Sequence, residues 1–213
     1  MGLYRIVLRP FLFALEAERA HRVTLAACET FGHNALVQRA LARRFALEYP
    51  QLAIDIAGLH FKTPVGLAAG FDKNGVAVAV TSRLGFGFVE VGSVSLHPSA
   101  GNVGRPRVWR LTADNGLRVH YGCPNDGVQA IANRLSGYDH RVPLGINLVE
   151  TNTGHIASAE HAADELATLI GRCANLADYL VLNLSCPNMP GGKGLFDMSA
   201  QLQNLLQIGR AHV

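Results

Sequence analysis

Four short apolar segments, each ending in small or polar residues, constrain the fold of this chain more than any other feature. They lie near residues 65–69, 87–92, 143–147 and 179–183. Helix-compatible stretches such as 127–135 and 159–173 separate them. A strand that delivers side chains to the catalytic face of an α/β barrel has this pattern, because it is buried along its length and polar where it ends. The sequence therefore predicts four parallel strands whose carboxyl ends meet at one rim.

The most informative strand end is the hexapeptide NLSCPN at residues 183–188. It sets the thiol of Cys186 between Asn183 and Asn188, whose amides can hydrogen-bond a planar, amide-rich ligand. Pro187 restricts the turn that carries the thiol. By itself the hexapeptide is equally compatible with a strand end that holds a buried, inert cysteine, because free cysteine is among the most buried residue types.

A second strand end combines small residues with a cation. The segment PVGLAAGFDKNG contains Ala68, Ala69 and Gly70, which leave room for a flat ring to lie against the main chain. Lys73 follows them and can present a mobile cation to an anionic ligand or an electron-rich cofactor. The alternative is a tight connection from strand to helix with Lys73 in solvent.

A third strand end has the same character. The segment LGFGFVEVGSV at residues 84–94 contains a strand with alternating apolar positions that ends in Gly92 and Ser93. Three strand ends therefore share small or polar residues, as expected where parallel strands converge on one site.

These segments, together with GRPRVWRL at residues 104–111 and PLGIN at residues 143–147, resemble the dihydroorotate dehydrogenases. The resemblance is closest to the membrane-associated, quinone-reducing class 2 enzymes. It runs from EAERAH at residues 16–21 to NLSCPN in the family's order and spacing, but it covers only the N-terminal portion of a family member. The resemblance implies an α/β fold: a (β/α)8 TIM barrel, incomplete here with about its first four strands, behind an N-terminal helical extension.

The resemblance implies that residues 1–50 form a helical extension associated with the membrane and a quinone, and that residues 51–207 form the first half of an FMN-binding barrel. Residues 208–213 are expected to be a non-native tail on separate grounds given below, with a genuine polar C-terminus as the alternative. Apolar positions at helical intervals within residues 10–48 predict two short helices. Alternation within residues 52–62 predicts a hairpin that plugs the barrel base.

The chain is short for this architecture. A closed barrel of this type takes about 250 residues, whereas this chain has 213 and spends about sixty before the first barrel strand. The final hexapeptide, IGRAHV, matches one reading frame of a common sequencing-library adapter, so we exclude it from fold reasoning. Four strands would leave two exposed sheet edges, so we expect a truncated fragment with weak or no activity.

The resemblance also implies a reaction and a site. Dihydroorotate is oxidised to orotate in pyrimidine (UMP) biosynthesis, FMN accepts the hydride, and ubiquinone or another quinone accepts the electrons. Carried over by motif, the flavin contacts are Ala68, Ala69, Gly70, Gly92, Ser93, Asn147 and Asn183. Lys73, Asn183 and Asn188 would hold the substrate, and Cys186 would be the catalytic base.

Two departures from the class 2 pattern leave other functions open. Class 2 enzymes have serine at the position of Cys186, whereas class 1 enzymes have cysteine. The segment LRVHYGCPNDG aligns with the family's NRMGFNN, but Val119 replaces the substrate-binding asparagine, and His120 is a candidate substitute donor. NLSCPN is also similar to dihydropyrimidine dehydrogenases, so the alternatives are an FMN-dependent barrel oxidoreductase of a related pyrimidine and a nonenzymatic remnant.

Charge and hydropathy limit the classes of partner that the chain is expected to bind. The net charge of +3 is spread along the chain, so we expect no nucleic-acid partner. No apolar run approaches the roughly 18 residues of a transmembrane helix. Residues 4–15 combine Phe11 and Phe13 with Arg5 and Arg9, a composition suited to a lipid interface, although a helix packed on the barrel would also have it. We expect a peripheral protein on the cytoplasmic face of the inner membrane, with the cytoplasm as the alternative.

The cysteines and histidines indicate no metal site. The four cysteines, Cys28, Cys123, Cys173 and Cys186, lack paired spacing, so we expect reduced thiols and neither a disulfide framework nor zinc. The nine histidines include no helical i, i+4 ligand pair beside a carboxylate. His21, in the EAERAH segment, is expected to be structural.

Overall fold

The computed structural model describes residues 4–46, 49–139, 141–190, 203 and 206–207 of the 213-residue chain. The predicted non-native tail, residues 208–213, lies outside the described residues.

The N-terminal region is helical. It consists of a π-helical turn η1 (Tyr4–Leu8) and helices α1 (Arg9–Ala14), α2 (Ala17–Gly32) and α3 (Ala35–Phe45). The prediction of two short helices was wrong, because two side-chain caps start new helices within the same apolar pattern. The Glu16 carboxylate accepts from the backbone N–H of Glu18 and Arg19, and the Asn34 side chain accepts from Leu36 and Val37. Among the described residues, no helix has both the length and the apolar character needed to cross a membrane.

A β-hairpin follows the short 3-10 turn η2 (Pro50–Leu52), as predicted. Strands β1 (Ile54–Ile56) and β2 (Leu59–Phe61) pair antiparallel across Ala57 and Gly58, which both have positive φ, as tight hairpin turns require. The Phe61 ring lies 5.7 Å from the ring of Phe88, which directly precedes β4. The hairpin therefore lies near the amino ends of the sheet strands, although β1 itself is exposed.

The central sheet has four parallel strands, which confirms the strand prediction. They are β3 (Leu67–Asp72), β4 (Val89–Val94), β7 (Leu144–Leu148) and β8 (Tyr179–Leu182), hydrogen-bonded in the order β3-β4-β7-β8. Within the described residues the sheet remains open and forms no closed barrel. This is the α/β arrangement expected for the first four strands of a TIM barrel.

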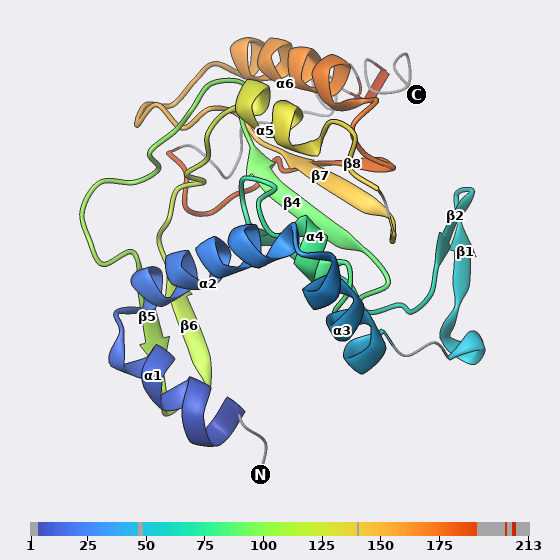
Figure 1. The fold of residues 1–213 in the computed structure, drawn as a ribbon. Coiled ribbons are helices and arrows are strands. Elements are labelled where there is room, and N and C mark those ends of the chain that lie inside the picture. Colours follow the sequence, from blue (N-terminus) through green and yellow to red (C-terminus); the bar gives the residue numbers. More distant parts are fainter. Residues whose placement is uncertain (1–3, 47–48, 140, 191–202, 204–205, 208–213) are drawn as a thin grey trace.

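The core lies between this sheet and the helices that connect its strands. These helices are α4 (Val78–Thr81), α5 (Val128–Leu135) and α6 (Ala159–Cys173), and α5 and α6 lie side by side over the sheet (Figure 1). Every residue of β7 is buried, and Ile146 packs with Val91 of β4 and Leu169 of α6 in one cluster. The core therefore aligns the carboxyl ends of the strands rigidly.

A second hairpin, which the sequence analysis did not predict, leaves the sheet between β4 and β7. Strands β5 (Val108–Leu111) and β6 (Gly116–Val119) pair antiparallel beside α1 and α2, across the molecule from the β1–β2 hairpin (Figure 1). The Arg110 guanidinium donates to the backbone oxygens of Leu12 and Leu15 at 3.0 and 2.8 Å. These bonds tie the hairpin to the end of α1.

Candidate active site

A cavity of about 790 Å³ lies at the carboxyl ends of the four sheet strands, closed on one side by the start of α2 and the β5–β6 hairpin. Its lining contains most of the residues predicted for the site: Ala68, Ala69, Gly70, Lys73, Ser93, Asn147, Asn183, Cys186 and Asn188. Gly92 does not line the cavity but directly precedes Ser93. Segments separated by more than a hundred residues in the chain thus meet in one place.

The end of β3 forms a flat, open wall of the cavity. Ala68 and Gly70 are exposed, and Ala69 is half-buried between them. Gly70 has a φ of +108°, a conformation that only glycine adopts readily, and a Cβ added there would have no neighbour within 4 Å among the described residues. This wall leaves space for a planar group to approach the main chain.

Three polar side chains that line the cavity form a hydrogen-bonded row. They come from β4, from β7 and from the residue after β8. The Asn183 amide donates to Ser93 Oγ at 3.1 Å, and Ser93 Oγ donates to Asn147 Oδ1 at 2.5 Å. Ser93 and Asn147 are buried. These bonds fix the orientation of both amides. Among the described residues, the Asn147 Nδ2 donor and the Asn183 Oδ1 acceptor then remain available to a ligand.

Gly92 makes this row possible. Its φ is +121°, and a Cβ at this position would lie 2.5 Å from the backbone oxygen of Asn147. Glycine is therefore required for β4 to approach β7 closely enough to place Ser93 beside Asn147.

Lys73 is held by a turn that its neighbour Asp72 shapes. The fully buried Asp72 carboxylate accepts from the backbone N–H of Val76 and Ala77 at 3.1 and 2.7 Å. Lys73 Nζ donates to the Gly70 backbone oxygen and lies 4.4 Å from the centre of the Tyr121 ring. Burial lowers the pKa of Lys73 and raises the pKa of Tyr121 to about 12.

The Cys186 thiol lies in the loop after β8 and lines the same cavity. Its Sγ is 3.4 Å from the Sγ of Cys123, which belongs to the loop after β6. Hydrogen bonding from Cys123 lowers the pKa of Cys186 to about 6, and the same interaction together with burial raises the pKa of Cys123. Cys186 is therefore the thiol that ionises first. All four cysteines are free.

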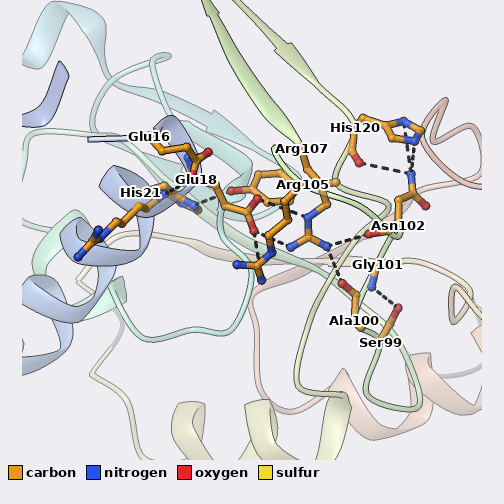
Figure 2. Close-up of polar contacts among 12 residues, drawn as sticks. Glu16, Glu18, His21, Ser99, Ala100, Gly101, Asn102, Arg105, Arg107 and His120 are labelled. Atoms are coloured by element: carbon orange, nitrogen blue, oxygen red, sulfur yellow. Dashed lines mark hydrogen bonds and ion pairs between the residues drawn. The ribbon is translucent and has the colours of Figure 1, made fainter. Parts of the chain in front are cut away.

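A buried ion pair fastens α2 to the loop before β5 (Figure 2). Arg107 Nη2 lies 2.6 Å from Glu18 Oε1, and Arg107 Nη1 donates to the backbone oxygens of Ala100 and Asn102. The Arg107 hydrogen bond lowers the pKa of Glu18. The Arg107 guanidinium also lies 5.1 Å from the centre of the Tyr121 ring. The ion pair therefore supports the Tyr121 ring, which Lys73 Nζ contacts.

His21 connects α2 to β3. Its Nε2 lies 2.7 Å from the backbone oxygen of Phe71, and burial lowers its pKa. The ring also lines the cavity (Figure 2 shows it projecting from α2). This backbone contact agrees with the structural role expected for His21.

Val119 and its candidate substitute His120 lie in different surroundings. Val119 lines the cavity, so an apolar side chain stands where the resemblance predicts an amide. His120 is exposed, and its ring contacts the Asn102 amide instead of lining the cavity (Figure 2). His120 as a substitute donor is therefore not supported by the geometry.

Sequence reasoning missed several residues that build the site. Tyr121, Asn102 and Cys123 lie on loops, and Glu18 and Arg107 meet only through the tertiary fold. Arg107 does lie in the GRPRVWRL segment, directly before β5, but its two neighbouring arginines, Arg105 and Arg110, give no signal that separates it from them. No group of three or more His, Cys, Asp or Glu side chains within the described part of the chain could hold a metal ion.

Comparisons with known proteins agree with this arrangement. The family model described as dihydroorotate dehydrogenase matches residues 51–210. A dihydroorotate dehydrogenase (quinone) from Acidithiobacillus ferrooxidans is 43% identical over 186 residues, which cover 87% of this chain and 50% of the relative. One from Gloeobacter violaceus is 42% identical over 191 residues, covering 90% and 52%. The chain thus spans about half the length of the curated relatives it matches.

Solved structures give the same result. A crystal structure of DHODH in complex with ferulenol from Eimeria tenella aligns with a TM-score of 0.69 at 32% identity, covering 83% of this chain and 49% of that one. Its ligand-free counterpart aligns with a TM-score of 0.68 at 31% identity, covering 84% and 53%. With the strand order, the cavity and the matched residues taken together, the chain belongs to the dihydroorotate dehydrogenase family.

Proposed function

We propose that this chain forms the base-bearing and flavin-facing walls of a site that oxidises dihydroorotate to orotate, with FMN as hydride acceptor and a quinone as electron acceptor. Such a reaction serves pyrimidine (UMP) biosynthesis. One observation carries the proposal: an ionisable thiol, a lysine and three amides converge on one cavity at the carboxyl rim of a parallel sheet. The named relatives are quinone-type dihydroorotate dehydrogenases, which favours the same reaction.

The residues present fit a flavin. The Ala68–Gly70 wall leaves room for a planar ring, and the fixed amides of Asn147 and Asn183 offer a donor and an acceptor suited to an imide edge. A volume of about 790 Å³ is within the usual range for cofactor and ligand sites. FMN, when bound, accepts the hydride, so the protein's own task is to bind, orient and move one proton.

The cation and amides suit an anionic cyclic amide. Dihydroorotate has a carboxylate and an imide, which Lys73 and the amides of Asn183 and Asn188 can complement. Lys73 is half-buried, so a charge pair formed there would be weakly screened by water.

Cys186 is the proposed base. A thiolate with a pKa of about 6 is largely formed at neutral pH, and its cavity position allows it to take the proton from the carbon next to the one that loses hydride. The Cys123 S–H is positioned to stabilise that thiolate.

The electron acceptor would reach the cavity between the N-terminal helices and the β5–β6 hairpin. Ala17, Val108 and Leu117 make this side of the cavity apolar. Ile6, Phe11 and other apolar side chains of η1 and α1 are exposed beside Arg5 and Arg9, which is compatible with an anionic lipid surface. We therefore propose a peripheral protein at the cytoplasmic face of the inner membrane.

One observation favours a second substrate. Val119 lines the cavity where an amide would otherwise contact the substrate, and a missing hydrogen-bond partner in a buried site costs about 1–3 kcal/mol. An FMN-dependent oxidoreductase of a related pyrimidine without the dihydroorotate carboxylate is the alternative.

A substrate comparison separates the two. This chain, joined to the C-terminal half of the Acidithiobacillus ferrooxidans relative of which it covers 50%, would be purified, inspected for flavin absorbance, and assayed with dihydroorotate and with dihydrouracil, using a soluble quinone as acceptor. We expect bound FMN and turnover of dihydroorotate alone. Turnover of dihydrouracil alone would establish the alternative, and a protein that binds no flavin would refute both.

A further inference from the structure

The Cys123 and Cys186 thiols form a contact pair although they are 63 positions apart in the sequence. Their sulfur atoms are 3.4 Å apart, and a covalent S–S bond is about 2.05 Å long. The sulfurs must therefore approach by only about 1.4 Å, which is within the reach of small side-chain rotations. Both residues are half-buried and line the 790 Å³ cavity, so small solutes can reach them.

Hydrogen bonds hold both loops in place. The buried Asn125 amide donates to the Cys123 backbone oxygen at 3.0 Å, and Asn152 Nδ2 donates to the oxygen of Gly122 at 2.9 Å. On the other loop, Asn102 Nδ2 donates to the Asn188 oxygen at 2.8 Å. The two sulfurs are thus kept adjacent by backbone anchors that do not involve the thiols.

The two thiols are chemically unequal. Cys186 ionises first because the Cys123 S–H donates to it, while Cys123 remains protonated. A thiolate beside a protonated thiol is the arrangement in which one sulfur reacts with an oxidant and the other resolves the product.

We propose that Cys186 and Cys123 form a peroxide-sensitive pair that closes into an intrachain disulfide. The Cys186 sulfur attacks one oxygen of hydrogen peroxide, the O–O bond breaks, and the leaving hydroxide takes a proton to become water. The Cys123 sulfur then attacks the resulting sulfenic acid, the S–O bond breaks, and a second water leaves with the Cys123 proton. In total, two thiols are oxidised to one disulfide while one peroxide is reduced to two waters.

The disulfide would remove the sulfur proposed as the base. This consequence rests on the proposed function, whereas the disulfide itself does not. Cys123 would also protect Cys186, because rapid closure of the disulfide prevents further oxidation to the irreversible sulfinic acid.

Thiol counting and peptide mass mapping test the pair without any measurement of turnover. The reduced chain, whose folding is verified by circular dichroism, is treated with hydrogen peroxide and digested without reductant. We expect two of the four thiols to be lost, a cross-linked peptide containing Cys123 and Cys186, and full reversal by dithiothreitol. Cys28→Ser should form the same cross-link, because Cys28 lies outside the cavity lining.

The variant Cys123→Ser provides the decisive contrast. It should form no cross-link and should instead accumulate sulfinic acid at Cys186. Sulfinic acid at Cys186 in the unsubstituted chain, or a cross-link to Cys28 or Cys173, would overturn the proposal. Because the peptide map is obtained without any measurement of turnover, either result would overturn the redox pair and leave the proposed function untouched.

Discussion

At the scale of single residues, the reactivity of Cys186 depends on its neighbour. Cys186 has no described cation in hydrogen-bond contact, and the Cys123 S–H is the largest influence that favours its thiolate. A free thiol has a pKa of about 8.5. The interaction between the two sulfurs therefore lowers the pKa of Cys186, the proposed base, into the range where the thiol is ionised at neutral pH.

Removal of Cys123 should shift the pH dependence of the reaction. Because a thiolate base is active above its pKa, kcat/KM should rise with pH through about 6 in the native protein. Cys123→Ala removes the donor, so the pKa of Cys186 should rise. The increase of kcat/KM with pH should then occur at more alkaline pH. Cys123→Ser retains a hydroxyl donor and should give a smaller shift. A profile unchanged in both variants would show that Cys123 does not tune the base.

Lys73 should contribute substrate affinity. Lys73→Met removes the cation beside Gly70 and Tyr121, and a lost hydrogen bond to a charged group costs about 1.5–3 kcal/mol, so KM for dihydroorotate should rise about 10- to 100-fold. The matched control is Lys62→Met, an exposed lysine that does not line this cavity. Steady-state kinetics would measure both, and an equal KM for the two variants would remove Lys73 from substrate binding.

At the scale of elements, the Glu18–Arg107 pair joins α2 to the loop that leads into β5. Removal of one member leaves a buried charge without its partner, so Glu18→Gln or Arg107→Met should each destabilise the fold by about 3–5 kcal/mol. The double variant should recover part of this loss. Arg105→Ala is the control, because the exposed Arg105 lies 3.8 Å from Glu18 and should contribute under about 1 kcal/mol.

The same pair predicts a pH dependence of stability. Arg107 lowers the pKa of Glu18 below its ordinary value of 4.5, so the stabilisation is fully present above 4.5 and is lost as pH falls through the folded-state value. Urea denaturation at pH 7 and at successively lower pH would measure it. A Glu18→Gln penalty that stays constant across this range would show that charge does not contribute.

The sheet strands were predictable from the sequence, and elements defined by side-chain caps were not. Each strand is a short segment rich in apolar residues that ends in small or polar ones, and β7, the strand buried along its whole length, has the sequence LGINL. The β5–β6 hairpin was missed although Asn115 and Gly116 form a recognised turn signal, and Asn115 has the positive φ such turns need. The helix count failed because Glu16 and Asn34 start helices without interrupting the apolar period.

In the candidate site, too, some residues could be predicted from the sequence and others could not. Residues at strand ends, such as Asn147 and Asn183, could be placed at a common rim because parallel strands align their carboxyl ends. Contacts between loops could not be predicted, because their geometry depends on turns such as the one at Cys123, which has a φ of +54°. The Cys123–Cys186 contact is the clearest example, since neither spacing nor periodicity relates the two residues.

At the scale of the whole molecule, the open sheet governs what the chain can do alone. Strands β3 and β8 each have one unpaired edge within the described residues, and β8 is only half-buried. Exposed sheet edges favour association and lower stability. We therefore expect the 213-residue chain to turn over dihydroorotate weakly or not at all compared with the same chain joined to the C-terminal half of the Acidithiobacillus ferrooxidans relative.

The exposed apolar side chains at the N-terminal end should direct membrane binding. Ile6 and Phe11 are 63% and 59% exposed beside Arg5 and Arg9. The chain should therefore sediment with phosphatidylglycerol vesicles, less so at high salt and less so in an Ile6→Ser, Phe11→Ser variant. The control is Ile156→Ser, an equally exposed apolar residue on the loop before α6. Equal sedimentation of all variants would place the membrane contact elsewhere or exclude it.

The central claim is that the Cys186 thiol moves the proton in a dihydroorotate-oxidising site. The most direct test joins this chain to the C-terminal half of the Acidithiobacillus ferrooxidans relative, mixes the FMN-loaded protein anaerobically with dihydroorotate, and follows bleaching of the flavin absorbance. Cys186→Ala should retain FMN but slow bleaching by about 10²–10⁴-fold, while Cys186→Ser should retain weak activity at more alkaline pH. An alanine variant that bleaches at the native rate would contradict the account.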